Sequence, residues 1–219
     1  MNIYAINGSP RKSGNTATVL EHALAGARSA HPEGMVNGSL IQLYELNFHS
    51  CASCFACKRL NGPSYGRCGL RDSLWPVLDK LARADALIFG SPIYFGGISG
   101  LLRSFLERLL FPFGVYDAAY SSIAPKKMPT AFIYTMNVTA EVMAAQGYAD
   151  LLRPMERFAG NVFLPPRVLY VHDTYQFDDY SKYKADRFSE AAKRKQWDDQ
   201  FPLDCRRAFD LGAALATGA

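Results

Sequence analysis

Short polar side chains crowd the first loop of the sequence, NIYAINGSPRKSGNT at residues 2–16. An apolar run, a loop of small residues and an apolar helical pattern follow one another. This arrangement binds phosphate through backbone N–H groups and the positive end of a helix. The loop offers five polar side chains: Ser9, Arg11, Ser13, Asn15 and Thr16. A simple turn with one N-cap residue is the alternative, but a cap needs a single such residue. The loop therefore predicts a site for a phosphate.

The loop differs from two better-known phosphate loops. It lacks the closing Gly-Lys-Ser/Thr of a Walker A motif, and it lacks the GxGxxG pattern of dinucleotide sites. Many short donors around one compact group instead suit a terminal monophosphate. FMN carries such a group.

A second loop, GSPIYFGGISG at residues 90–100, follows another apolar run. Tyr94 and Phe95 supply flat apolar surface, and Gly96 and Gly97 let backbone approach a planar ring without a β-carbon in the way. The alternative is a glycine-rich turn whose aromatic side chains belong to the core. Beside the phosphate loop, this segment favours a seat for the isoalloxazine ring of FMN.

A cysteine group forms the third candidate site. Cys51, Cys54 and Cys57 lie three residues apart, and Cys68 follows after ten more residues. Four thiolates on one loop could hold a [4Fe–4S] cluster or an all-cysteine zinc ion. Free or redox-active thiols are the third interpretation, and the sequence leaves all three open. Cys205 fits a small buried hydrophobic residue in a helix.

Composition limits the class of protein. The chain has 219 residues, 49% of them hydrophobic, and a net charge of +4. The basic run at residues 193–195 is followed by Asp198 and Asp199, so we interpret it as a solvated helix face and expect no nucleic-acid partner. We also expect no membrane span, because no apolar run approaches the required ~20 residues. The start lacks the features of a signal peptide, which favours a cytoplasmic protein with reduced thiols.

The histidines and the helical ion pairs carry less information. Four histidines lie apart without metal-ligand spacing, and we interpret each as structural or exposed: His22, His31, His49 and His172. Arg103 and Glu107 have the spacing of an ordinary i,i+4 helix pair.

Apolar runs alternate with helical patterns along the chain. The predicted strands are 3–6, 39–46, 84–90, 130–135 and 167–171, and the predicted helices are 16–29, 72–83, 99–110, 148–159 and a tail from 184 to 215 broken near Pro202. Such alternation predicts an α/β doubly wound parallel sheet with helices on both faces. Its ligand is expected at the carboxyl ends of the strands. Two segments are longer than ordinary loops: 49–71 and 111–127.

The pair GSPRKSGNT and GSPIYFGGISG, with the tail TYQFDDYSKY at residues 174–183, resembles the NADPH-dependent FMN reductase group of flavodoxin-like proteins. Within that group it is most similar to the iron–sulfur flavoproteins and their cluster-free relatives. The resemblance implies a five-stranded sheet of order 2-1-3-4-5, bound FMN, and a homodimer or homotetramer. One flavodoxin-like domain over residues 1–219 is expected, with the cysteine loop at 49–71 and a helical tail at 184–219.

The resemblance also assigns residues. The phosphate contacts map onto Ser9, Arg11, Ser13, Asn15 and Thr16, and the ring contacts map onto Pro92, Ile93, Tyr94, Phe95 and Gly96. The loop at residues 135–137 would flank the ring. Iron–sulfur flavoproteins carry a compact cysteine motif in the loop matching 49–71, which implies a [4Fe–4S] ligand set of Cys51, Cys54, Cys57 and Cys68. Here the spacer between Cys57 and Cys68 is longer than in the family, so the assignment of Cys68 as the fourth ligand stays open.

The expected function is an FMN-dependent oxidoreductase that takes electrons from NAD(P)H as co-substrate and passes them to a quinone, a flavin, an aromatic compound or a protein. No catalytic acid or base is assigned, because flavin N5 carries the chemistry. The alternative is an iron–sulfur flavoprotein that exchanges electrons with ferredoxin-like partners without small-molecule turnover. A zinc- or thiol-based redox sensor on the same scaffold is a third hypothesis.

Overall fold

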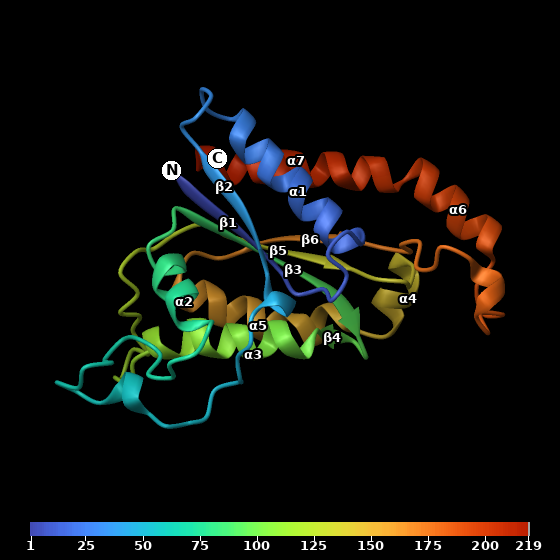
Figure 1. The fold of residues 1–219 in the computed structure, drawn as a ribbon. Helices are drawn as coiled ribbons and strands as arrows, with labels where there is room; N and C mark the ends of the chain where they lie inside the picture. Colours follow the sequence, from blue (N-terminus) through green and yellow to red (C-terminus); the bar gives the residue numbers. More distant parts are fainter. Residues whose placement is uncertain (219) are drawn as a thin grey trace.

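Five parallel strands form the centre of the molecule in the computed structural model, which describes residues 1–218. They are β1 (Asn2–Asn7), β2 (Asn37–Gln42), β3 (Ala86–Tyr94), β5 (Thr130–Thr135) and β6 (Arg167–Val171). Their order is β2-β1-β3-β5-β6, and the two-residue β4 (Gly97–Ile98) pairs antiparallel with the end of β3 (Figure 1). Counted without β4, this is the predicted 2-1-3-4-5 order, so the flavodoxin-like fold is confirmed.

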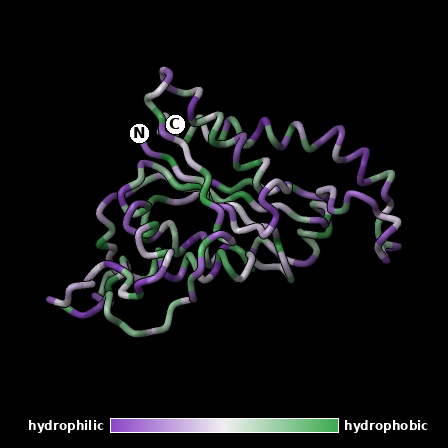
Figure 2. The backbone as a smooth tube through the Cα atoms, viewed as in Figure 1, coloured by the Kyte–Doolittle hydropathy of each residue, from purple (hydrophilic) through white to green (hydrophobic). Residues whose placement is uncertain are grey.

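Helices cover both faces of the sheet (Figure 1). One face carries α1 (Asn15–Ser29) and α7 (Phe201–Thr217), and the other carries α2 (Trp75–Leu81), α3 (Gly100–Leu110) and α5 (Tyr148–Val162). Because both faces are covered, the central strands are almost wholly apolar, and the strands in Figure 2 are coloured mainly as hydrophobic. Two core clusters result, one on each face of the sheet.

Two short helices lie near the carboxyl end of the sheet, α4 (Ala140–Ala145) and the polar α6 (Glu190–Asp199). Four 3₁₀ turns complete the fold: Leu43–Glu45, Ala56–Lys58, Phe111–Phe113 and Tyr180–Lys182. The cysteine loop protrudes beside α2 and the end of α3 (Figure 1). Within the described residues, no helix is both long and apolar enough to cross a membrane.

Several element boundaries differ from the sequence expectation. The second strand ends at Gln42, because a 3₁₀ turn takes over at Leu43. The third strand runs on to Tyr94 through the predicted ring loop, because β4 pairs with its end. The tail breaks at Gln200, and Pro202 lies in the first turn of α7, where a missing N–H costs no helical hydrogen bond.

Candidate functional site

The first loop leaves β1 at its carboxyl end and turns directly into α1. Ser9 is buried; its backbone N–H donates to Asn7 Oδ1 at 2.9 Å, and its Oγ accepts from the Arg11 N–H at 3.2 Å. The N-cap of α1 is Gly14, and no side chain caps the helix there. Asn15 and Thr16 therefore do not serve as the N-cap. The first-turn N–H groups of a 15-residue helix instead face the loop without a capping side chain, as an anion site requires.

Two buried polar atoms beside Ser9 lack partners within the protein. Asn7 Nδ2 at the end of β1 and Gln42 Oε1 at the end of β2 have no hydrogen bond, although Gln42 Nε2 donates to the Ser9 carbonyl at 3.0 Å. Buried polar groups are almost always paired, so an unpaired donor or acceptor calls for a partner outside the protein, such as a water, an ion or a ligand. A donor and an acceptor beside an uncapped helix start fit the polar chain and phosphate of a mononucleotide such as FMN.

The C-terminal half of the chain closes this loop from outside. Arg11 Nη1 donates to the Gln176 carbonyl at 2.6 Å, and Asn15 Nδ2 donates to the Tyr175 carbonyl at 2.8 Å. Arg11 is thus engaged with backbone, whereas the Ser13 hydroxyl is exposed at the loop surface. The resemblance of residues 174–183 to the family did not predict these hydrogen bonds, because they join segments more than 150 residues apart.

Ser99 joins the phosphate loop to the ring loop. Its Oγ donates to the Gly8 carbonyl at 2.7 Å, and its N–H donates to Ser91 Oγ at 2.9 Å, while the Gly8 N–H donates to the Gly90 carbonyl at 2.9 Å. A β-carbon on Gly8 would lie 2.8 Å from Leu102 Cβ. The two loops therefore pack closely and hold one another in place.

The ring loop presents exposed aromatic surface. Tyr94 is 48% exposed and Phe95 fully so, while Pro92 and Ile93 are half-buried. Phe95 has φ of 52°, a left-handed conformation that costs energy for a non-glycine residue and is often found at functional sites. Gly96 is buried with φ of 78°, and a β-carbon there would meet Leu151 Cδ1 at 2.9 Å. A flat ring would cover this otherwise exposed patch.

A third loop, after β5, is fixed from two sides. Thr135 Oγ1 and Thr16 Oγ1 share a hydrogen bond of 2.7 Å, which ties the loop to the start of α1. Lys193 of α6 donates to the carbonyl and to Oδ1 of Asn137, both at 2.6 Å, and also pairs with Asp173. Lys193 is buried, so the prediction of a solvated basic run was wrong at this position. Asn137 is thus held in position by a lysine of α6 that lies 56 residues further along the sequence.

Two of the histidines and Cys205 pack within the fold, whereas His22 and His49 are exposed. His31 Nε2 contacts the Ala216 carbonyl at 3.1 Å, and His172 Nε2 lies 3.2 Å from Met143 Sδ. Burial lowers the pKa of His172, so its neutral form is favoured. Burial first, and then the charge of Asp204, raises the pKa of Cys205 to about 11, which keeps it an unreactive thiol.

The four loop cysteines line one small cavity of about 20 Å³. All four are free thiols, and burial raises the pKa of Cys57. The cavity is about the size of one water molecule, and residues 1–218 contain no group of three or more side chains placed to bind a metal ion. The structure therefore brings the four predicted ligands to one cavity, but it does not arrange three or more of them as a metal site.

Arg108 of α3 holds this cysteine loop together, and the sequence analysis missed it. All five of its N–H donors are used. Nε donates to Cys68 Sγ at 3.3 Å; Nη1 donates to the His49 carbonyl at 3.0 Å and to Asp72; Nη2 donates to the Leu70 carbonyl at 3.3 Å and to Asp72 Oδ1 at 2.9 Å. The two ends of the loop thus meet at one guanidinium.

The charge of Arg108 acts on its carboxylate partner. The Arg108 side chain is fully buried. Burial raises the pKa of Asp72, but the hydrogen bonds and charge of Arg108 outweigh this effect and hold that pKa below its usual value. The sequence signal for this pair was an arginine within the apolar stripe of α3, between Phe105 and Leu109, where a charge needs a buried partner. By contrast, the expected pair of Arg103 and Glu107 forms at 3.1 Å on the exposed side.

Comparisons with known proteins found a matching family and individual relatives. The model of the family described as NADPH-dependent FMN reductase matches residues 1–171. An iron–sulfur flavoprotein of Methanocaldococcus jannaschii is 34% identical over 108 residues, which are 49% of this chain and 51% of the relative. One of Clostridioides difficile is 34% identical over 119 residues, 51% of this chain and 50% of the relative. The match therefore spans about half the length of these curated relatives.

Solved structures share the fold. The NAD(P)H:quinone oxidoreductase from Methanothermobacter marburgensis superposes with a TM-score of 0.72 at 16% identity, covering 98% of each chain. An azoreductase from Bacillus anthracis gives a TM-score of 0.59 at 14% identity, covering 100% of this chain and 99% of the other.

Proposed function

Because the chain belongs to the NADPH-dependent FMN reductase family, we propose that it binds FMN between its first loop, ring loop and third loop and acts as an NAD(P)H-dependent oxidoreductase. Electrons would pass to a quinone, a flavin, an aromatic compound or a protein. The observation that carries the proposal is the pairing of an uncapped helix start and two orphaned buried polar atoms with exposed aromatic surface one strand away.

Each loop has a defined task in this proposal. FMN held by these loops would supply the redox chemistry as the acceptor of a hydride from the nicotinamide. The first turn of α1, with Ser9, Ser13, Asn15 and Thr16, would bind the phosphate through backbone and hydroxyl donors. Arg11, whose charge lies beside this loop, would act by holding residue 176 over it and by attracting the phosphate at longer range.

The ring loop would orient the isoalloxazine. Tyr94 and Phe95 would cover one side of the ring, Pro92 and Ile93 would support the loop, and Gly96 would let backbone approach the ring edge. Because Lys193 and Thr16 fix the loop after β5, residues 135–137 would border the ring on its other side. We assign no protein acid or base in this proposal, because the flavin would carry the redox chemistry and the further proton that a quinone needs would come from solvent.

The decisive experiment tests the phosphate loop. Asn15→Leu with Thr16→Val removes two polar side chains while keeping similar volume. Because these side chains also bond to Tyr175 and Thr135, we expect FMN affinity to fall by about tenfold or more through loss of both phosphate contacts and loop support. FMN fluorescence titration gives the affinity, and NAD(P)H oxidation with a quinone gives turnover. Thr130→Val is the control, because this buried threonine lies at the opposite end of β5. Unchanged FMN affinity in the double variant would refute the assignment.

A second candidate function rests on the cysteine cavity. Four cysteines around one cavity, together with relatives named iron–sulfur flavoproteins, support a [4Fe–4S] cluster held by Cys51, Cys54, Cys57 and Cys68. The chain would then be an electron-transfer protein with ferredoxin-like partners. Iron and sulfide analysis of anaerobically purified protein separates this from a zinc site or free thiols. If the protein contains flavin but no iron and turns over NAD(P)H steadily, the electron-transfer hypothesis is excluded and the reductase proposal remains.

The remaining features of the proposal are assembly and location. We propose a single flavodoxin-like domain over residues 1–219 that forms a homodimer or homotetramer in the cytoplasm, with no nucleic-acid or membrane partner. The exposed Phe95 supports assembly to the extent that bound flavin leaves its ring uncovered, because a subunit partner would cover the remainder. Sedimentation of the FMN-loaded protein tests the oligomer.

A further inference from the structure

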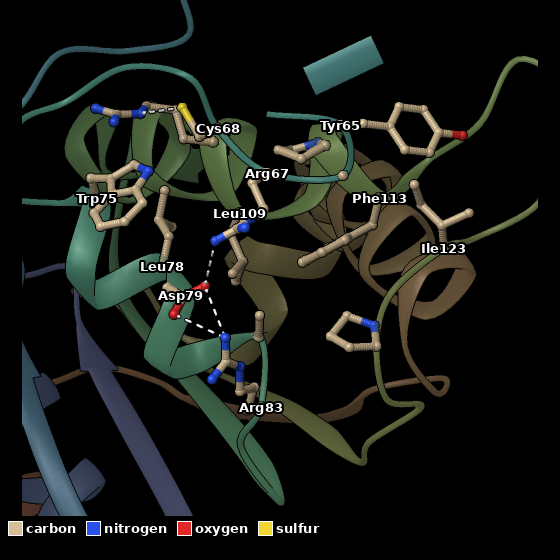
Figure 3. Close-up of a pocket in the computed structure, with 15 residues that line it drawn as sticks. Tyr65, Arg67, Cys68, Trp75, Leu78, Asp79, Arg83, Leu109, Phe113 and Ile123 are labelled. Carbon is tan, nitrogen blue, oxygen red and sulfur yellow. Dashed lines mark hydrogen bonds and ion pairs between the residues drawn. The ribbon is translucent and has the colours of Figure 1, made fainter. Parts of the chain in front are cut away.

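A cavity of about 460 Å³ lies beside the cysteine loop, with Cys68 on its wall (Figure 3). Its walls come from α2, from the C-terminal half of α3 and from residues 65–68. Asp85 and Lys126, which precede β3 and β5, form an ion pair at the amino edge of the sheet, and the neighbouring Arg83 and Pro125 line the cavity. The cavity therefore lies toward the amino edge, whereas the flavin loops leave the carboxyl edge.

Most of the cavity wall is apolar and aromatic. Trp75 and Leu78 lie on one side and Phe113 and Ile123 on the other (Figure 3). The guanidinium of Arg71 lies 3.8 Å from the centre of the Trp75 ring, which helps to hold that ring in place. A volume of this size, lined in this way, is typical of sites for small organic ligands.

The polar groups of the wall carry an excess of positive charge. Arg67 and Arg83 share one carboxylate: Arg67 Nη1 lies 3.6 Å and Arg83 Nη2 3.2 Å from Asp79 (Figure 3). These contacts use one nitrogen of each guanidinium, so both keep N–H donors for another anion. Arg108 also reaches the wall, but its donors are fully used by the cysteine loop. One unbalanced guanidinium charge over an apolar floor favours a ligand that is both flat and anionic.

We propose that this cavity is a second ligand site, distinct from the flavin site, for a planar aromatic anion such as an aromatic sulfonate or carboxylate. The ring lies between Trp75 and Phe113, and the anionic group pairs with Arg67 and Arg83 in competition with Asp79. Because Cys68 forms part of the same wall, a bound ligand shields its sulfur. The inference goes beyond the proposed reductase activity, and binding here requires neither FMN nor a cluster.

The first test is a titration of the FMN-loaded protein with anthraquinone-2-sulfonate by calorimetry. Trp197→Phe leaves Trp75 as the sole tryptophan, so quenching of its fluorescence locates the ligand. Arg67→Gln with Arg83→Gln should raise the Kd by about tenfold or more, because charge-assisted contacts are lost. Asp79→Asn should lower the Kd, because it releases both guanidinium groups; damage to the fold cannot produce tighter binding.

Matched controls separate this site from others. Arg103→Gln breaks a similar exposed ion pair on α3 outside the cavity and should leave the Kd unchanged. Ligand should also slow alkylation of Cys68 but not of Cys54, which is exposed and lies outside this wall. The proposal is overturned if the Asp79 and arginine variants bind as the wild type does. It is overturned equally if Phe95→Ala abolishes binding, which would place the ligand on the ring loop, or if the arginine variants change only the oligomeric state.

Discussion

At the scale of single residues, the pair of Arg108 and Asp72 shows how one buried charge can organise a segment with little secondary structure. The cysteine loop contains one 3₁₀ turn, at Ala56–Lys58, and its other backbone hydrogen bonds belong to short turns between residues 57 and 67. Lys58 reinforces it by donating to the carbonyls of Phe111 and Gly114, with its ammonium 4.3 Å from the centre of the Phe111 ring. Two cations thus join the loop to α3 and to the segment that follows it through backbone carbonyls, in addition to the turn hydrogen bonds within the loop.

Asp72→Asn should destabilise the protein in a pH-dependent way. Removing one partner of a buried ion pair leaves Arg108 uncompensated, so we expect a loss of about 3 kcal/mol in the free energy of unfolding at pH 7. The pKa of Asp72 is held low in the folded protein, so its stabilising contribution is present above the unfolded pKa of about 3.9 and is lost as pH falls through the folded pKa. Urea unfolding of both proteins between neutral and acid pH measures the difference.

The matched control for this prediction is Asp186→Asn. Asp186 pairs with Lys184 at 2.5 Å, but both side chains are largely exposed, and such pairs contribute little. If the difference between wild type and Asp72→Asn stays constant down to acid pH, the charge of Asp72 is not what stabilises the loop.

At the scale of elements, α1 and α7 approach one another through glycine. A β-carbon on Gly26 would lie 1.9 Å from the Phe209 carbonyl oxygen, and one on Gly212 would lie 1.8 Å from the Ala23 carbonyl oxygen. The backbones of the two helices are therefore in direct contact at both positions. Since α1 begins in the proposed phosphate loop, α7 supports that loop from behind by fixing the position of its helix.

Gly212→Ala should separate these helices. Because backbone atoms cannot move aside as a flexible side chain can, we expect a loss of about 3 kcal/mol or more in the free energy of unfolding, the upper end of the range for overpacked interiors. Chemical denaturation measures the loss. Gly100→Ala, at the start of α3, is the control, because a β-carbon there meets nothing within 4 Å. Equal stability of the two variants would mean that α7 shifts freely on α1, contrary to this packing.

At the scale of the whole molecule, the sequence predicted what depends on local pattern. Apolar runs predicted the central strands, and with the family resemblance they predicted the sheet order. Glycine and serine spacing placed both proposed flavin loops at the carboxyl edge. The patterns did not reveal three sets of hydrogen bonds. Lys193 donates to Asn137, residues 175 and 176 accept from the first loop, and Arg108 donates to the cysteine loop. Each of these joins distant segments through one polar side chain, and such a contact leaves no periodic signal.

The proposed flavin loops and the cysteine loop lie in separate regions of the molecule, and this separation gives a further prediction. The ring loop precedes α3 at Gly100, and the cysteine loop packs at Arg108, eight residues along that helix or about 12 Å at 1.5 Å per residue. Flavin binding and the cysteine loop should therefore be independent. Replacing Cys51, Cys54, Cys57 and Cys68 by serine should leave FMN affinity unchanged and remove any bound iron, as fluorescence titration and iron analysis would measure.

The reciprocal test changes the phosphate loop and measures the cysteine loop. Asn15→Leu with Thr16→Val should weaken FMN binding but leave the iron content and the alkylation rates of the loop cysteines as in the wild type. Independence follows because the flavin loops are held by contacts among Gly8, Gly90, Thr16 and Thr135, while the cysteine loop is held by Arg108 and Lys58. Loss of FMN from the serine variant would instead mean that the two regions are coupled, either through α3 or through a second subunit that places its cysteine loop against this flavin site.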